Sequence, residues 1–403
     1  MQTSLLSPGF LGIALVAIVL LPMLRGSPRE IAFLMLNLLF IGALVLGPLG
    51  ALSTLLFTLL GYALVLLAAR ARLGGLIAGI IVLVALFIFM RRYEFLEWFL
   101  PTEWLPRVLS TIGLSFLFFR VVHTMIDAHG GTLGRVRMLA YVNYCLSFTT
   151  FLMGPIQRYQ DYREQWNGER LAIPMEWEAH LDAVLRILVG LAKVLVLGVF
   201  FETHALRADT VIHDLTVAGL IVQVYSFWLF LYLNFSGYCD VVIGIGSLLG
   251  VRPPENFDKP FLARNISDFW QRQHRSLTLW LSDYVFTPLY KALLTSPRTA
   301  RHKLLAANLS LMATMLVSGL WHGTTFSFLL FGLVHGLWFV IYRSWDELLT
   351  SRLTRRGVQK LRAHPLAYAG GVLLTFNATA FSFVFFRLSS EQAMQAFSQL
   401  LPW

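Results

Sequence analysis

The stretch GLWHGTTFSFLLFGLVHG, residues 319–336, is apolar almost throughout, and His322 and His335 are its only ionisable side chains. Ionisable groups at membrane depth are costly and usually face a protein interior or a wet pathway. Gly323 and the two threonines after it predict a helix break, and irregular backbone at that depth needs protein or water around it. His322 is therefore a functional candidate. The alternative is a neutral imidazole that packs between helices by bonding a carbonyl.

The second histidine of this stretch points in another direction. His335 follows His322 by 335 − 322 = 13 positions, so at about 100° per residue the two side chains lie on different faces of any continuous helix. The stretch contains no acidic residue that could complete a two-histidine metal site. We therefore expect no metal, and we expect His335 to be a packing or tunnel-lining residue.

The whole chain has the composition of an integral membrane protein. Of its 403 residues, 57% are hydrophobic and 13% are charged, against roughly 25% charged residues in soluble domains, and the mean hydropathy is +0.67. Apolar runs of about the 20 residues that cross a bilayer predict an all-α polytopic protein with about 11 spans and one or two non-spanning helices. These runs begin near residues 10, 31, 51, 75, 109, 138, 185, 215, 304, 326 and 366.

Charge gives a sketch of the topology. The net charge is +10, and the basic residues lie mostly in connections, which is the usual cytoplasmic bias of membrane proteins and no sign of nucleic-acid binding. Their distribution over the first connections favours an N-terminus on the outside. The longest hydrophilic stretch is about 20 residues, whereas a folded domain needs at least about 50. We therefore expect one membrane domain, residues 1–403.

The segment of residues 256–290 is too polar to face lipid on all sides. Asn265 is predicted to cap a helix with Asp268 in its first turn. Apolar and charged side chains then alternate at helical spacing, and the sequence allows two interpretations: an interfacial helix with an incidental histidine, or a histidine that faces a cavity. One stripe of this helix holds Trp270, His274, Leu277 and Leu281, and the other holds Asp268, Arg272, Arg275 and Ser282.

Several motifs together resemble the membrane-bound O-acyltransferase (MBOAT) family. They are NFDKPF, DFWQRQHRSLTLWLSDYVF, GLWHG and FGLVHG, together with YLNFSGYCDVVIGIGSLLG, FTTFLMGPIQRY, GLSFLFFRVVHTMIDAHGG and FSFVFFRLSS. They occur in order over roughly residues 105–390, whereas residues 1–104 match only in hydropathy. The resemblance is to the bacterial branch with the teichoic-acid D-alanyl transfer protein and the alginate O-acetyltransferase membrane subunit, and it implies helices around a central tunnel.

The resemblance also implies a reaction and its residues. An acyl group would pass from a thioester or another activated donor to a hydroxyl, with His322 as the family's catalytic histidine and His274 as its second one. Histidine suits this chemistry because its pKa lies near neutrality. His274 could orient the acceptor, assist proton transfer or donate to the developing oxyanion. Further candidates for substrate or tunnel contacts are Asn234, Ser236, Asp240, Trp270, Arg272, Ser318 and Trp321.

The chain departs from the family pattern at two positions near these candidates. Asn234 stands where the family usually has Asp, and Gln273 stands where it usually has Trp. The segment after residue 288 also lacks the glycine pair of alginate-type members, which favours the D-alanyl transfer type.

Donor, acceptor and location follow as expectations. We expect no tightly bound cofactor, a cytoplasmic donor such as an acyl carrier protein thioester or acyl-CoA, and an outside-facing partner or glycopolymer acceptor, in a bacterial inner membrane. Arg298, Arg301 and Lys303 could dock the donor, or could lie beside anionic lipid. The alternatives to this function are a transporter or flippase for an envelope precursor and a lipid or protein O-acyltransferase of the same fold.

Overall fold

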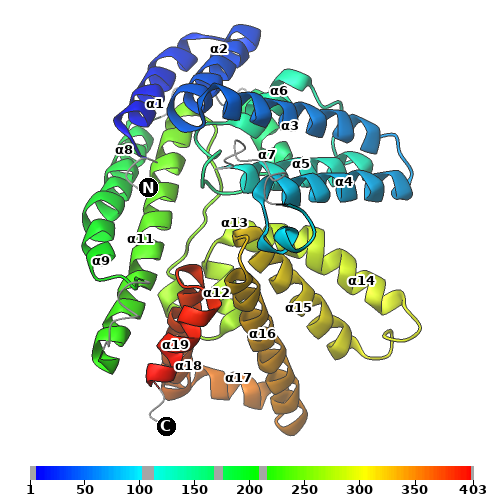
Figure 1. Cartoon of the computed structure of the whole chain (residues 1–403), viewed down its shortest axis with the longest axis vertical. Coiled ribbons are helices and arrows are strands. Elements are labelled where there is room, and N and C mark those ends of the chain that lie inside the picture. Colours follow the sequence, from blue (N-terminus) through cyan, green and yellow to red (C-terminus); the bar gives the residue numbers. More distant parts are fainter. Residues whose placement is uncertain (1–5, 102–112, 168–175, 208–215, 401–403) are drawn as a thin grey trace. The chain divides into compact units, whose positions relative to one another are not determined.

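The computed structural model describes residues 6–101, 113–167, 176–207 and 216–400, and all regular elements within these ranges are helices (Figure 1). The all-α class is confirmed. The chain forms two compact units. Unit 1 comprises Met1–Val196 and Asn234–Glu255, and unit 2 comprises Leu197–Leu233 and Asn256–Trp403. The family motifs at residues 105–390 occur in both units, and a single domain over residues 1–403 stays a prediction.

Eight helical stretches of the described residues are long and apolar enough to cross a membrane, so the chain is a multi-pass membrane protein. Each begins within about ten residues of an apolar run that the sequence predicts as a span. They are Gly26–Val45, Gly47–Ala68, Leu73–Arg91, Trp177–Thr203, Val217–Leu249, Lys303–His322, Phe326–Arg352 and Pro365–Phe386.

The three remaining predicted spans are shorter helices. They are Pro8–Met23, α5 (Leu114–His129) and α6 (Met138–Leu146). Most side chains of α5 and α6 are buried within the protein, so their apolar character reflects a protein core as much as contact with lipid. Hydropathy cannot distinguish these two causes, which explains why about 11 spans were expected.

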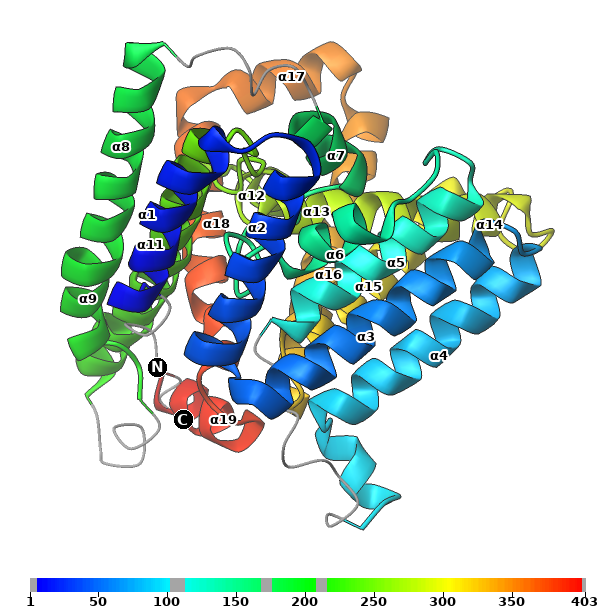
Figure 2. The same cartoon turned by 90° about the horizontal axis from the view of Figure 1, so that it is seen from above.

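Unit 1 holds the N-terminal helices. Within it, α3, α4 and α5 pack side by side (Figure 2). Its elements are α1 (Pro8–Leu20), η1 (Leu21–Met23), α2 (Gly26–Leu39), η2 (Phe40–Val45), α3 (Gly47–Ala68), α4 (Leu73–Arg91), η3 (Glu94–Trp98), α5, α6, α7 (Tyr159–Asn167), α8 (Trp177–Ala192) and the second half of α11 (Val217–Leu249). The π-helix η6 (Lys193–Gly198) follows α8.

A buried arginine ties part of unit 1 together. The Arg120 guanidinium on α5 is 1% exposed and donates hydrogen bonds to the carbonyl oxygens of Tyr144 and Cys145 at 2.8 Å. It also donates to the carbonyl oxygen of Thr150 at 2.6 Å. The bonds to Tyr144 and Cys145 satisfy carbonyls at the end of α6, where the helix leaves them without partners. Cys145 and Cys239 are both buried.

Unit 2 holds both histidines of the predicted site. Its longest helices, α15 (Lys303–His322) and α16 (Phe326–Arg352), form an antiparallel hairpin (Figure 1). Its other elements are α9 (Val199–Thr203), the first half of α11, η7 (Pro260–Leu262), α12 (Ile266–Arg272), α13 (Arg275–Leu281), η8 (Ser282–Phe286), α14 (Thr287–Thr295), α17 (Arg355–Ala363), α18 (Pro365–Ser382), η9 (Phe383–Phe386) and α19 (Ser390–Leu400).

Glycines let the two helices of the hairpin approach closely. A Cβ atom added at Gly319 would overlap the carbonyl oxygen of Phe328 and would lie 3.1 Å from the Cα of Gly332. One added at Gly332 would lie 2.5 Å from the carbonyl oxygen of Met315. Small residues at such crossings are typical of helix pairs in membranes, because close backbone approach increases the van der Waals contact.

The amphipathic segment before the hairpin is not one continuous helix. Its start is as predicted, because the Asn265 side chain accepts a hydrogen bond from the Asp268 amide at 2.9 Å. The continuous helix expected after this cap is wrong. The chain breaks at His274, whose φ of 49° lies in the left-handed region, and α13 begins at the next residue. Helical periodicity continues across the break, so hydropathy alone does not reveal it.

Candidate active site

His322 lies where α15 ends. The predicted break at Gly323 is confirmed: α15 ends at His322, Gly323 is extended with φ −158°, and α16 begins at Phe326. A Cβ atom added at Gly323 would overlap the ring of Phe328. Glycine is therefore needed for close packing at this position, and this packing holds His322 at the turn of the hairpin.

His274 is positioned by the segment that precedes α12. His274 is 4% exposed, and its Nδ1 lies 3.3 Å from Oδ1 of Asn256. The same oxygen accepts hydrogen bonds from the amide and the hydroxyl of Ser276, at 3.1 Å and 2.8 Å. The Arg275 amide donates to the Asn256 carbonyl oxygen at 2.9 Å. These contacts stabilise the positive φ of His274, a conformation that costs a non-glycine residue about 1–3 kcal/mol.

The structure brings the two predicted catalytic histidines together. The ring centroids of His274 and His322 lie 6.2 Å apart, and the Trp321 ring lies 5.8 Å from His274 and 4.8 Å from His322. The Phe386 and Phe331 rings lie 5.0 Å and 5.9 Å from His322. The imidazoles thus lie beside an aromatic wall that keeps water away from part of the site.

Burial affects the protonation state of His274. It lowers the pKa of His274 well below its ordinary value, and the neighbouring His322 lowers this pKa further. An uncharged imidazole is favoured because the charged form loses its hydration when it is buried. His274 is therefore neutral near pH 7 and keeps one nitrogen lone pair.

His335 is not part of this pair but belongs to a separate hydrogen-bonded chain. The Trp270 Nε1–H donates to Nδ1 of His335 at 3.1 Å, and His335 Nε2 lies 2.9 Å from the Ser382 hydroxyl. That hydroxyl donates to the Thr379 carbonyl oxygen at 2.7 Å, so His335 Nε2 carries the proton and Ser382 accepts it in a hydrogen bond. The chain links α12, α16 and α18 and uses both ring nitrogens of a fully buried histidine.

Three further candidates lie in unit 2 close to these groups. Trp321 is in the aromatic wall, and Trp270 is the indole that bonds His335. Ser318 is fully buried one helical turn before His322, on the same face of α15. Within the described part of the chain, its hydroxyl has no hydrogen-bond partner. In contrast, the Thr314 hydroxyl one turn earlier donates to the Ser310 carbonyl oxygen at 2.6 Å.

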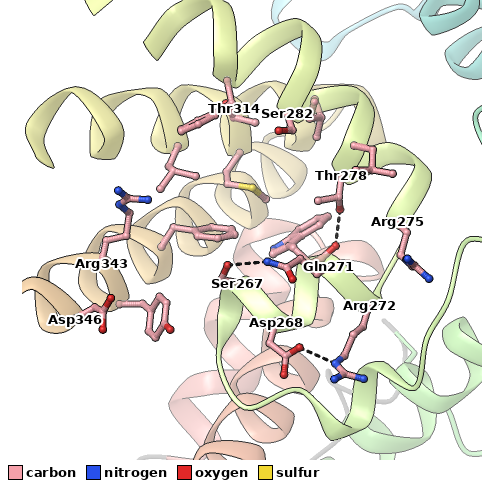
Figure 3. A pocket seen from close by; sticks show the side chains of 18 of the residues that line it. Ser267, Asp268, Gln271, Arg272, Arg275, Thr278, Ser282, Thr314, Arg343 and Asp346 are labelled. Atoms are coloured by element: carbon pink, nitrogen blue, oxygen red, sulfur yellow. Dashed lines mark hydrogen bonds and ion pairs between the residues drawn. The ribbon is translucent and has the colours of Figure 1, made fainter. Parts of the chain in front are cut away.

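Arg272, another predicted site residue, lines a cavity. Its guanidinium donates to Asp268 at 2.7 Å (Figure 3). This bond raises the pKa of Arg272, with a smaller contribution from the Asp258 charge. The cavity has a volume of about 830 Å³ and lies between α12, α13, η8, α15 and α16. Along α15 it is lined by residues from Leu304 to Met315, and on α12 it reaches Trp270.

The candidates on α11 belong to unit 1. Asn234 and Ser236 are 8% and 2% exposed, whereas Asp240 forms ion pairs with two cations. It accepts hydrogen bonds from Lys193 at 2.6 Å and from Arg186 at 3.1 Å, and these bonds tie α11 to α8 and the start of η6. Arg186 also bonds both carboxylate oxygens of Glu255, at 2.6 Å and 2.5 Å.

The predicted docking residues lie at the other end of α15 from His322. Arg298, Arg301 and Lys303 are exposed, and no ion pair involves them within the described residues. At 1.5 Å per residue, α15 separates Lys303 from His322 by about 28 Å. The described residues contain no group of three His, Cys, Asp or Glu side chains that could hold a metal ion.

Sequence reasoning missed the groups that contact His274, His322 and His335. Asn256 lies in the NFDKPF motif, Phe331 begins the FGLVHG motif, and Ser382 and Phe386 lie in the FSFVFFRLSS motif. A motif match could indicate that Asn256 matters, but no local pattern connects it with a histidine 18 positions later.

Comparisons with known proteins cover most of the chain. Residues 33–365 match the model of the MBOAT, membrane-bound O-acyltransferase family. A teichoic acid D-alanyltransferase of Streptococcus thermophilus is 30% identical over 293 residues, which is 69% of this chain and 68% of that protein. The teichoic acid D-alanyltransferase of Bacillus subtilis is 26% identical over 323 residues, 79% of each chain. A probable alginate O-acetylase, AlgI, of Pseudomonas aeruginosa is 28% identical over 72% of this chain and 51% of that protein.

Proposed function

This chain belongs to the membrane-bound O-acyltransferase family and is an O-acyltransferase, and we propose that it transfers an acetyl or D-alanyl type group to a hydroxyl of a cell-envelope glycopolymer. The donor is a cytoplasmic activated acyl group, either an acyl carrier protein thioester or acyl-CoA. The named activities of the relatives support this substrate class. The same names disfavour the transporter or flippase alternative, because those relatives are named as acyl-transferring enzymes.

The observation that carries the proposal is the pairing of His274 and His322 at the hairpin turn, with ring centroids 6.2 Å apart. An alcohol is a poor nucleophile until a base takes its proton in the transition state. His322 takes the proton as the hydroxyl oxygen bonds to the acyl carbon and the carbon–sulfur bond of the donor breaks. His322 then returns the proton to the leaving sulfur, so that the products are an ester and a thiol.

The donor route that fits this arrangement starts at Arg298, Arg301 and Lys303. These cations attract an acidic carrier or an anionic cofactor, and the cavity beside α15 leads from Leu304 to Met315. Seven residues, or about 10 Å, separate Met315 from His322. A long flexible acyl arm could cover the distance along this helix, and the buried Ser318 hydroxyl is a candidate contact for its carbonyl.

The remaining parts of the proposal concern the acceptor and the membrane. The acceptor comes from the outside, either as a glycopolymer or through an outside-facing partner, and the histidines are where it meets the donor in a central tunnel. Asn234 and Ser236 stay candidates from the sequence, and Asp240 is engaged with Arg186 and Lys193 within unit 1. The location is the cytoplasmic membrane of a bacterium, in contact with its lipids, and nucleic acid plays no part.

The test is mass spectrometry of surface glycopolymers from cells with and without the protein. Ester-linked acyl groups should disappear without the protein, and His322→Ala at wild-type expression should reduce them at least about a hundredfold, as for the loss of a general base. His180→Ala, which changes an exposed histidine on α8, is the matched control and should keep the wild-type ester content. Normal esterification with His322→Ala would refute the assignment.

A further inference from the structure

The tautomer of His274 can be read from its neighbours. Three contacts converge on Oδ1 of Asn256, from His274 Nδ1, the Ser276 amide and the Ser276 hydroxyl. The Ser276 amide can only donate, so the atom that faces it is the oxygen of the Asn256 amide and not its nitrogen. An amide oxygen can only accept a hydrogen bond. The Nδ1 atom of His274 must therefore carry the proton in this contact.

A neutral imidazole carries one proton. If Nδ1 holds it, Nε2 on the other edge of the ring has the lone pair. We infer that Asn256 is a positioning residue that holds His274 in the Nδ1-protonated tautomer, so that Nε2 accepts a hydrogen bond from a second, unreacting hydroxyl of the acceptor instead of donating one to an oxyanion. This inference rests on the proposed acyl transfer at the two histidines.

The spacing of the histidines agrees with this role. A ring nitrogen lies only about 1 Å from the centre of its ring, so a direct hydrogen bond of about 3 Å between two imidazoles needs centroids no more than roughly 5.5 Å apart. The observed 6.2 Å between His274 and His322 is longer. The two imidazoles therefore do not bond each other directly. His274 can then orient one hydroxyl of the acceptor, while His322 takes the proton of the hydroxyl that reacts.

The surroundings make Asn256 hard to replace. Asn256, His274 and Ser276 are 1%, 4% and 5% exposed, so water competes little for these contacts. The backbone reinforces them, because the Arg275 amide bonds the Asn256 carbonyl oxygen and the Asp258 amide bonds the Arg272 carbonyl oxygen, both at 2.9 Å. In an Nε2-protonated His274, Nδ1 would present a lone pair to the Oδ1 lone pairs, which is repulsive.

The experiment reads the tautomer directly. The full-length protein is labelled with [15N]histidine in lipid bilayers, and the His274 signals are identified as those lost in His274→Gln. The wild type should show a protonated Nδ1 and an unprotonated Nε2. Asn256→Ala should shift the population toward the Nε2-protonated tautomer and lower the glycopolymer ester content as much as His274→Gln. Ser276→Ala removes one of the three contacts to the same oxygen and keeps the Asn256 acceptor, so it should shift the tautomer and lower the ester content less than Asn256→Ala.

A second variant covers the case in which Asn256→Ala does not fold. Asn256→Asp keeps an acceptor, but its negative charge favours the imidazolium and raises the pKa of His274, so the His274 signals should titrate at a higher pH than in the wild type. The other groups around His274 are unchanged in this comparison: His322 on α15, Arg272 and Arg275 on either side in the chain, and Asp258 before α12. An unshifted titration in folded Asn256→Asp would contradict the contact.

The outcomes separate the two proposals. A wild-type His274 with its proton on Nε2, or a folded Asn256→Ala with normal ester content, would overturn the role of Asn256 and leave acyl transfer standing on His322. Normal ester content in His322→Ala would refute the proposed chemistry, whatever the tautomer signal shows.

Discussion

Replacement of His335 should lower the stability of the fold but not the activity, and replacement of His322 should lower the activity but not the stability. His335→Asn shortens a side chain whose two nitrogens bridge Trp270 and Ser382, and asparagine cannot reach both partners. One or two buried hydrogen bonds are lost, each about 0.6–1.7 kcal/mol in membrane proteins. The expected loss of unfolding free energy is therefore roughly 1–3 kcal/mol. The proposed catalytic pair, His274 and His322, is not touched, so the folded fraction should remain active.

His322→Ala should show the reverse pattern. His322 is partly exposed at the end of a helix, so its removal should change the melting temperature little, while ester formation falls at least about a hundredfold. The assay measures thermal unfolding of each purified variant in detergent and the ester content of glycopolymers, normalised to folded protein in the membrane. His274→Ala should match His322→Ala or fall between the two variants.

One result would refute this reasoning. If His335→Asn abolished ester formation as fully as His322→Ala, with an unchanged melting temperature, the Trp270–His335–Ser382 chain would not be a packing device. The roles assigned to the two histidines would then be wrong.

Three other changes test separate parts of the structure. In Gly323→Ala the new Cβ overlaps the Phe328 ring. A misplacement of about 1 Å is enough to disturb catalysis, so ester formation should fall at least about tenfold. Gly370→Ala, with open space around it, should leave ester formation unchanged. Reversal of Arg298, Arg301 and Lys303 to Glu should weaken binding of the acyl donor, and the affinity of the wild type for the donor should fall as the ionic strength rises. Unchanged affinity in a correctly inserted triple mutant would remove the docking proposal. The hydrogen bond from Arg186 lowers the pKa of Glu255 from 4.5 to about 2, so this carboxylate stabilises the fold above about pH 4.5 and loses the effect as the pH falls toward 2; the difference in melting temperature between wild type and Glu255→Gln should shrink over that range, and a constant difference would contradict the ion pair.

Sequence alone determined the class of this protein and the identity of its main side chains. The hydropathy of a segment depends only on its own residues, so eight of the predicted spans coincide with apolar helices. The break at Gly323 is also local, since a glycine followed by two β-branched threonines disfavours a continuous helix. The motifs around His322 and His274 carried the family and its chemistry, and the comparisons confirm that family.

Tertiary structure decided which partners each histidine has. His335 and His322 lie in one 18-residue stretch, yet one bonds an indole 65 positions earlier and the other faces His274, 48 positions earlier. The left-handed backbone at His274 depends on Asn256, which contacts it only because the segment before α12 folds back onto the start of α13. Hydrogen bonds between distant residues leave no periodic trace in a sequence. Hydrophobic spacing therefore predicted the helices, but not which nitrogen of which histidine has a partner.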